Sequence, residues 1–361
     1  MTEHLIAAVG SIVPDVSRRV HPDKSPVPLD KKPNQAGVGA LLSEVSHRDR
    51  FWDTNKKAAD LVAGLYALIP EFKKRSQRMF DCSMLLEFVP TPDKSTGEFR
   101  LWLKSARFCR VRNCPNCSWR RSLMWRARFM KRVAVPSFPK VRWLHLTLTV
   151  ENVPLNQLGV TLDKMNRAFQ RMIQRKGWPA LGFIKSTEVT RAKNDYAHPH
   201  FHVLICVLPS YFWEEYITKS QWISMWRVAL RADYDPSIKI QAYEMKTIEE
   251  NGEVRILAPA EILKYAVKSC DLIGNGKKPG LIRKGKKMDI EWLAEFTRQT
   301  DNRHFISTGG VLKDVFREET KNDDLLHPGE TSSEELEELT RLWFLWREQR
   351  YRRHASGMLP E

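Results

Sequence analysis

The sequence predicts an α+β fold built around an antiparallel sheet with flanking helices, and three observations favour this class. Segments with strand-like alternation are mixed with segments of helical periodicity along the middle of the chain. Two of the expected strands are separated only by a short polar loop, which is typical of an antiparallel hairpin. The order of strands and helices does not follow the regular alternation of a doubly wound parallel sheet.

The predicted elements divide the chain into five parts that differ in composition and periodicity. In order, these are a disordered leader at 1–40, a helical segment at 41–80, a cysteine-rich and basic region at 81–132, the sheet domain at 133–316 and a helical tail at 317–361. The leader is inferred from prolines among charges with little periodicity. The helical segment has its main helix from about Val45 to Arg78.

Within the sheet domain, each element is predicted from its own pattern. The alternation in WLHLTLTV predicts a strand at Trp143–Val150. Strands at Phe183–Thr190 and His200–Leu208 flank a polar loop and are expected to form a hairpin. The other expected elements are helices at Leu162–Arg175, Tyr211–Ala232 and Pro259–Cys270, and a strand at Ile238–Met245.

The tail is expected to form a helix from Ser332 to Arg353. Ser332 and Glu335 have the spacing of a capping box, which marks the start of a helix. Four apolar residues then follow at helical spacing: Leu336, Leu339, Trp343 and Trp346.

The composition favours a polyanionic partner. The formal net charge is +16 and the isoelectric point is near 9.6, so nucleic acid is the first candidate, through release of the counterions of its phosphates. A membrane is disfavoured because no run of 18 apolar residues occurs. We expect a cytoplasmic protein, because Glu3 precedes the apolar stretch Leu5–Val13 and no Lys or Arg does, whereas a secretion signal has a positive charge there.

The sharpest motif is HPHFHVLI at residues 198–205. Side chains two apart share one face of a strand, so His200 and His202 can bind one cation while Phe201 turns to the core. If the hairpin turns near Asn194, Glu188 falls opposite His200 and can be a third ligand. Two imidazoles and a carboxylate suit Mg²⁺ or Mn²⁺ when phosphate oxygens complete the shell. The alternative is that the histidines are ordinary strand residues.

A second motif is AEILKYAVKS at residues 260–269, on the expected helix. Glu261, Tyr265 and Lys268 have the spacing of one helix face. A tyrosine near a metal and a lysine can attack a phosphodiester, with the lysine offsetting the developing charge. Taken alone this signal is weak, because an exposed tyrosine beside a lysine is more often structural than catalytic.

The cysteines form a third signal. Four have a spacing typical of a metal site: Cys82, Cys109, Cys114 and Cys117. Four thiolates close a tetrahedral zinc site, which is structural because no position is left for a substrate. Unligated buried cysteines are the alternative. We interpret Cys206 and Cys270 as packing residues.

The segment from Leu101 to Arg132 contains ten Lys or Arg residues and no acid. We expect a basic helix that follows a DNA backbone and stacks bases on interleaved aromatic residues. The arginines expected to contact DNA are Arg110, Arg112, Arg120, Arg121, Arg126 and Arg128. The alternative is that Trp125 and Phe129, one turn apart, face the core.

Together these motifs resemble the rolling-circle replication initiators of small bacterial plasmids, the Rep_1-type branch of the HUH endonuclease superfamily. The resemblance runs from about Cys82 to Phe316. LHLTLTV is similar to the family's first strand motif, HPHFHVL to its metal motif, EILKYAVK to its tyrosine motif and RHFISTGGVLKD to a downstream glycine motif. Residues 1–80 and 317–361 do not take part.

The resemblance implies a five-stranded antiparallel sheet, with the histidines on a central strand and the tyrosine helix alongside. It also implies an enzyme that nicks one strand at a double-strand origin, keeps a 5′-phosphotyrosine link and leaves a 3′-hydroxyl for the host polymerase. Glu261 occupies the position of a glutamate that activates water at termination, and no second tyrosine lies near Tyr265.

The implied partners are plasmid origin DNA, the host polymerase and a host helicase, because no ATPase motif is found. A homodimer is left open, and no membrane partner is expected. Two rival interpretations remain at this point. A transposase or relaxase of the same superfamily shares the chemistry, whereas a zinc-containing DNA-binding regulator without catalysis explains only the charge and the cysteines.

Overall fold

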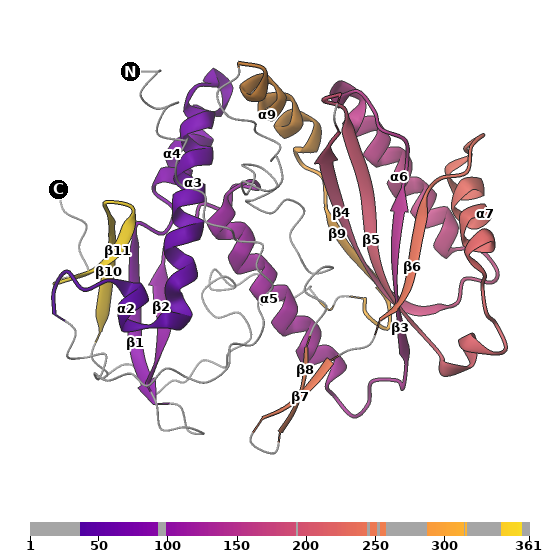
Figure 1. The fold of residues 1–361 in the computed structure, drawn as a ribbon, viewed down its shortest axis with the longest axis horizontal. Helices are drawn as coiled ribbons and strands as arrows, with labels where there is room; N and C mark the ends of the chain where they lie inside the picture. The colour runs from indigo at the N-terminus through magenta and orange to yellow at the C-terminus, as the bar shows by residue number, and fades with distance from the viewer. Residues whose placement is uncertain are drawn as a thin grey trace. The chain divides into compact units, whose positions relative to one another are not determined.

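The computed structural model describes residues 37–92, 99–192, 194–243, 246–250, 253–257, 287–313, 315 and 341–355. The chain forms two compact units (Figure 1). Unit 1 contains the described residues up to Met124 and those from Arg341 onward, and unit 2 contains those from Trp125 to Val315. The leader expected at 1–40 lies almost wholly outside the described residues.

Unit 1 is built on a four-stranded antiparallel sheet in the order β11-β10-β1-β2. Its strands are β1 (Leu85–Pro92), β2 (Phe99–Ala106), β10 (Leu342–Arg347) and β11 (Arg350–His354). Its helices before the sheet are α2 (Leu42–Val45), α3 (Phe51–Ala67) and α4 (Lys73–Phe80), with short 3-10 turns at His47–Arg50 and Pro70–Phe72. The expected helix at 45–78 is therefore broken, because Pro70 starts a new turn.

The core of unit 1 is aromatic. Trp52 of α3 packs edge-on against Phe88 of β1 and Tyr351 of β11. Tyr351 is fully buried, and its hydroxyl donates to the Ser83 carbonyl at 2.6 Å. The last strands of the chain therefore complete the sheet that begins near residue 85.

The helix expected at Ser332–Arg353 is wrong from residue 342 onward, where β10 and β11 form a hairpin. Glu348 and Gln349 both have positive φ angles, the geometry of a two-residue hairpin turn. Trp343 and Trp346 fit helical spacing, but they belong to the apolar run LWFLW, which is buried by pairing of β10 with β1. The expected capping box at Ser332 and Glu335 lies outside the described residues.

Unit 2 is a five-stranded antiparallel sheet in the order β6-β3-β5-β4-β9, so the expected fold class is confirmed. Its strands are β3 (Arg142–Thr149), β4 (Ala180–Arg191), β5 (Ala197–Val207), β6 (Ile238–Tyr243) and β9 (Ile306–Gly310). A separate hairpin pairs β7 (Lys246–Glu250) with β8 (Glu253–Leu257).

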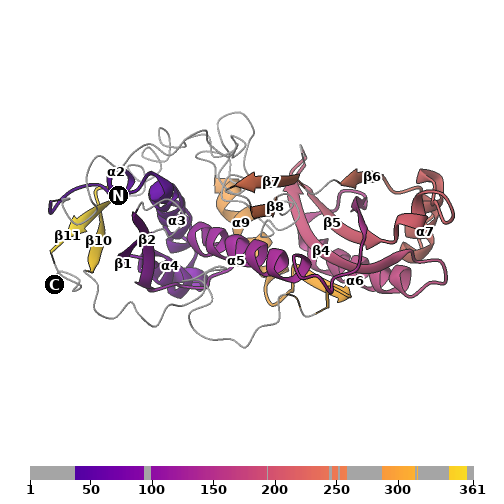
Figure 2. The ribbon, with the colours of Figure 1, turned by 90° about the horizontal axis from the view of Figure 1, so that it is seen from below.

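Helices α6 (Leu158–Ile173) and α7 (Lys219–Leu230) cover one face of this sheet (Figures 1 and 2). Phe201 and Val203 of β5 point to these helices and are fully buried. The helix expected at 211–232 begins only at Lys219, because Thr218 caps its first turn in a reciprocal pair with Gln221. A third helix, α9 (Lys287–Thr300), leads into β9.

The glycine motif at the end of β9 has a packing reason. Gly310 has φ +61°, and a Cβ there would lie 1.9 Å from the Leu181 carbonyl oxygen. A Cβ on Gly309 would lie 2.3 Å from the Phe183 ring. Glycines are therefore needed for β9 to approach β4. None of the described helices is long and apolar enough to cross a membrane.

Candidate functional site

A cluster of two histidines and a glutamate lies on the face of the unit 2 sheet opposite α6 and α7. β5 is the central strand, and its pairing with β4 places Glu188 directly opposite His200. His202 Nε2 lies 2.7 Å from Glu188 Oε2, and His200 Nε2 lies 3.5 Å from the same oxygen. The register expected from a hairpin turn near Asn194 is therefore confirmed.

These three side chains offer nitrogen and oxygen atoms that lie within 4.8 Å of one another. Their side chains are 10%, 18% and 27% exposed for His200, His202 and Glu188, so the cluster is partly open to solvent. Two imidazoles and one carboxylate with open positions fit a divalent cation that also binds phosphate oxygens. The donor set therefore fits Mg²⁺ or Mn²⁺.

The ionisation of Glu188 is set by two opposing effects. Burial favours the neutral carboxyl, but hydrogen bonds from His200 and His202 and their charges outweigh it and hold the pKa of Glu188 well below its usual range. The carboxylate is therefore charged at neutral pH, as a ligand for a cation must be.

His145 of β3 is a residue that the sequence reasoning missed. Its Nε2 lies 3.2 Å from Nδ1 of His202, and the two rings are stacked with their centroids 5.3 Å apart. His202 is thus held on one nitrogen by His145 and faces Glu188 with the other. The alternation in WLHLTLTV carried the signal, because it puts residue 145 on the face opposite the buried Leu144 and Leu146.

His198 has a different environment from the other two histidines of the motif. Its Nδ1 lies 2.7 Å from Asn152 Oδ1, and its backbone carbonyl is 3.2 Å from Nδ1 of His200. Burial, followed by the charge of His200, lowers the pKa of His198. His198 therefore lies beside the metal-ligand cluster and contacts it through its backbone.

In unit 1 the four predicted cysteines come together in one buried cluster, in which each sulfur lies next to at least one other. The Sγ atoms of Cys82 and Cys109 each lie 3.6 Å from Sγ of Cys117, and Cys114 Sγ lies 3.8 Å from Cys82 Sγ. Four thiolates at the usual Zn–S length occupy tetrahedron corners about 3.8 Å apart. The spacing therefore fits zinc.

The backbone around the cluster also suits thiolates. The Cys109 amide donates to Cys82 Sγ at 3.5 Å, and the Arg110 amide donates to Cys117 Sγ at 3.3 Å. Ser83 and Arg110, each directly after a cysteine, have φ near +55°, which turns the chain back toward the sulfurs. Hydrogen bonds from the other three cysteines lower the pKa of Cys82.

Helix α5 (Pro115–Val133) begins inside the cysteine cluster and is the basic helix that the sequence predicts. Arg120 is buried, and its guanidinium lies 5.1 Å from the centre of the Trp52 ring. Phe129 belongs to unit 2, is also buried, and packs edge-on against Trp143 of the same unit. These two side chains therefore have packing partners within the protein.

The other arginines proposed for DNA contact have varied surroundings. Arg110 is exposed, whereas the guanidinium of Arg121 donates to the Arg110 carbonyl at 3.2 Å. Burial lowers the pKa of Arg126. Contact of any of these side chains with DNA stays a prediction, as it does for Arg112 and Arg128. Cys206 is buried in β5, as expected for a packing residue.

The tyrosine motif lies outside the described residues. This holds for Glu261, Tyr265 and Lys268, for the helix expected at Pro259–Cys270, and for Cys270. Their roles stay predictions from the sequence.

Comparisons with known proteins agree with the resemblance seen in the motifs. The profile of the Rep_1 family, described as "Replication protein", matches residues 100–353. "Protein rep" of Lentilactobacillus hilgardii is 33% identical over 285 residues, covering 76% of this chain and 85% of the relative. "Protein rep" of Bacillus amyloliquefaciens is 30% identical over 292 residues, covering 75% and 82%.

A "Replication protein" of Staphylococcus aureus is 35% identical over 199 residues, covering 52% of this chain and 80% of the relative. No solved structure matches the chain significantly. The family match runs from β2 to β11, and the two relatives share about a third of their residues with this chain over three quarters of its length. On this basis the chain belongs to the Rep_1 family of replication proteins.

Proposed function

We propose that this protein starts rolling-circle replication of a plasmid by nicking one strand at the double-strand origin. In this proposal the protein keeps a 5′-phosphotyrosine link, leaves a 3′-hydroxyl as a primer and rejoins the strands at termination. The observation that carries the proposal is the cluster of His200, His202 and Glu188 on the central strand, in a member of a replication protein family.

The residues of the cluster would hold Mg²⁺ or Mn²⁺ and so fix where the scissile phosphate binds. When bound, such a cation polarises a phosphate oxygen and offsets charge that develops during attack on phosphorus. Glu188 supplies the negative charge of the donor set, because its pKa is held low by the two histidines. His145 orients His202 through their 3.2 Å contact.

We assign the nucleophile to Tyr265. Its phenolic oxygen forms the new bond to phosphorus as the bond from phosphorus to the 3′ oxygen breaks, and the phenolic proton passes through solvent to that leaving oxygen. Lys268 offsets the charge on the phosphate oxygens. At termination a DNA 3′-hydroxyl attacks the phosphotyrosine, which rejoins the strand and gives the proton of that hydroxyl to the Tyr265 oxygen. A link that is not rejoined is released by water, from which Glu261 accepts a proton, to give free Tyr265 and a 5′-phosphate.

The cysteine cluster would hold a structural zinc ion, because four thiolates leave no position for a substrate. It ties Cys82, ahead of β1, to Cys109 and to the first turn of α5. The partners in this proposal are the origin DNA, a host helicase and a host polymerase.

The test compares Glu188→Gln, which keeps the shape of the side chain but removes its charge, with the double variant His200→Ala/His202→Ala. Both should lose nicking of a labelled origin oligonucleotide and should bind Mn²⁺ weakly in a calorimetric titration. The control is His304→Ala, because His304 is an exposed histidine of unit 2. Nicking by the double variant at the wild-type rate would exclude this metal site. A wild-type protein that binds the origin without cutting it would support the non-catalytic regulator.

A further inference from the structure

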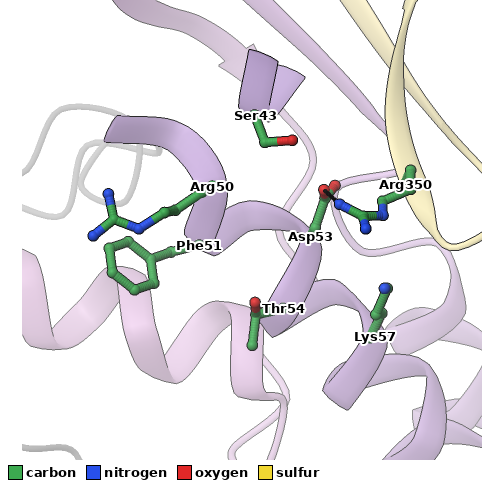
Figure 3. Close-up of a pocket in the computed structure, with 7 residues that line it drawn as sticks. All are labelled: Ser43, Arg50, Phe51, Asp53, Thr54, Lys57 and Arg350. Carbon is green, nitrogen blue, oxygen red and sulfur yellow. Dashed lines mark hydrogen bonds and ion pairs between the residues drawn. The ribbon is translucent and has the colours of Figure 1, made fainter. Parts of the chain in front are cut away.

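Unit 1 contains a pocket of about 290 Å³ at the beginning of α3, in a different unit from the histidine cluster. Figure 3 shows Asp53 and Lys57 of α3 pointing toward Arg350 of β11, with Ser43 of α2 nearby. A water molecule takes up about 30 Å³ in the liquid, so the pocket has room for a phosphate group with its ester oxygens.

The charges around the pocket do not balance. Its lining includes three cations, Arg50, Lys57 and Arg350, and a single carboxylate, that of Asp53. Asp53 is already engaged, because it accepts a hydrogen bond from the Tyr351 amide at 2.8 Å and lies 3.4 Å from Arg350. The pocket therefore carries two formal positive charges in excess.

Among the described residues, Lys57 is the cation of this pocket that has no hydrogen-bond or ion-pair partner. Within the described part of the chain its ammonium makes no hydrogen bond and no ion pair, in contrast to Lys56, which is bound to Asp60. Burial and the neighbouring charge of Arg350 lower the pKa of Lys57, and Asp53 opposes this shift only in part. Two cations held close together without enough counter-charge favour an anionic ligand.

The aromatic residue of the pocket does not offer a platform for a base. The guanidinium of Arg50 lies 4.6 Å from the centre of the Phe51 ring and covers it (Figure 3). Arg50 also donates to the His47 carbonyl at 3.0 Å, which holds it in place. Hydroxyls of Ser43 and Thr54 complete the lining. Arg50 thus already covers one face of the Phe51 ring, and the cations and hydroxyls of the lining suit a phosphate.

We propose that this pocket, through Lys57 and Arg350, holds one backbone phosphate of the duplex at the origin, away from the strand that is cut. Contacts to duplex phosphates fix the position of a protein on DNA without reading sequence. This inference rests on the proposed action on DNA, but it concerns a different group of residues from the nicking site. It assigns a role to the α3 region, which lies outside the matched family motifs.

The test measures affinity for origin duplex against salt concentration for the full-length chain and for Lys57→Gln. Each phosphate contact contributes about −0.9 to the slope of log affinity against log salt, so this variant should lose about 0.9 of the slope. The affinity advantage of the wild type should then shrink about 3.5-fold between 50 and 200 mM salt. Lys57→Arg should restore the slope.

The matched control is Lys74→Gln, the same loss of charge at an exposed position of α4 outside the pocket. The slope of this variant should equal that of the wild type. Equal losses for Lys57→Gln and Lys74→Gln would show that only general surface charge matters, and would overturn the proposal. The unfolding midpoint of Lys57→Gln should not fall, since Lys57 has no hydrogen-bond or ion-pair partner among the described residues to lose, and burial and Arg350 both disfavour its charge.

Two further arms separate the alternatives. If the pocket takes a free nucleotide, calorimetry with ATP and with inorganic phosphate will show binding that Lys57→Gln loses, while its duplex affinity stays normal, and the proposal is wrong. Nicking of a short single-stranded oligonucleotide should be the same for Lys57→Gln and the wild type. If the wild-type protein does not nick this oligonucleotide, the proposed nicking function is wrong. The comparison of duplex salt slopes would still decide whether the pocket binds a phosphate.

Discussion

His145 should control how tightly the cluster on β5 binds a cation. Its Nε2 contacts Nδ1 of His202 at 3.2 Å, on the opposite side of the ring from Glu188. Partners that orient a ligating histidine typically contribute 10-fold to 100-fold in metal affinity, or about 1.4–2.7 kcal/mol. His145→Leu should therefore weaken Mn²⁺ binding by that factor, because the ring of His202 loses its orientation.

The assay is calorimetric titration of Mn²⁺, followed by nicking rates at low and at saturating Mn²⁺. His145→Leu should need more Mn²⁺ for half-maximal nicking and should recover most of the rate at saturation. His145→Gln keeps a polar group that can hydrogen-bond Nδ1 of His202. Its Mn²⁺ affinity should therefore lie between that of His145→Leu and that of the wild type. An Mn²⁺ affinity of His145→Leu equal to the wild-type value would refute the orienting role, and a rate that saturation cannot restore would show that His145 acts on the reaction itself.

Three further predictions concern the rest of the chain. Cys114→Ser should lower the content of about one zinc per chain, measured by elemental analysis, and should lower the melting temperature, because structural zinc contributes folding free energy; zinc-free wild-type protein never exposed to chelator would contradict this. Gly310→Ala should reduce the free energy of unfolding in urea by more than the about 1–2 kcal/mol of a positive φ angle alone, because a Cβ would meet the Leu181 carbonyl. Gly177→Ala, where φ is +90° and nothing lies near the new Cβ, gives the φ cost by itself, and equal losses would argue against a clash. Burial lowers the pKa of Lys185 to about 8, so as the pH rises the folded state releases this proton before the unfolded state does. The free energy of unfolding should therefore rise between about pH 8 and 10.5, by up to about 3 kcal/mol. Lys185→Met should lack this rise, and an identical pH profile for both proteins would count against the buried charge.

The features that the sequence predicts well are local ones. The period of two in HPHFHVLI puts His200 and His202 on one face, and a short hairpin then decides that Glu188 lies opposite His200. The spacing of Cys109, Cys114 and Cys117 predicts a metal site. Cys82 was assigned to the same site from 27 residues upstream, and the fold brings it there.

The features that the sequence does not predict depend on contacts between residues far apart in the chain. Trp343 and Trp346 fit a helix by spacing, and only pairing with β1, more than 250 residues earlier, makes their segment a strand. The Arg120 guanidinium covers the Trp52 ring of α3, a contact that spacing alone does not indicate, while its contact with DNA stays a prediction. His145 was overlooked because its contact with His202 crosses from one strand to the next.

The central claim, cutting with a covalent tyrosine link, is tested most directly by trapping the link itself. The chain is incubated with Mn²⁺ and a single-stranded origin oligonucleotide labelled at its 3′ end, because a 5′-phosphotyrosine retains the fragment downstream of the nick. We predict a labelled protein band that survives SDS for the wild type and for His304→Ala, and none for Tyr265→Phe or for His200→Ala/His202→Ala. A labelled band that persists in Tyr265→Phe would contradict the account, and so would the absence of any such band for the wild type.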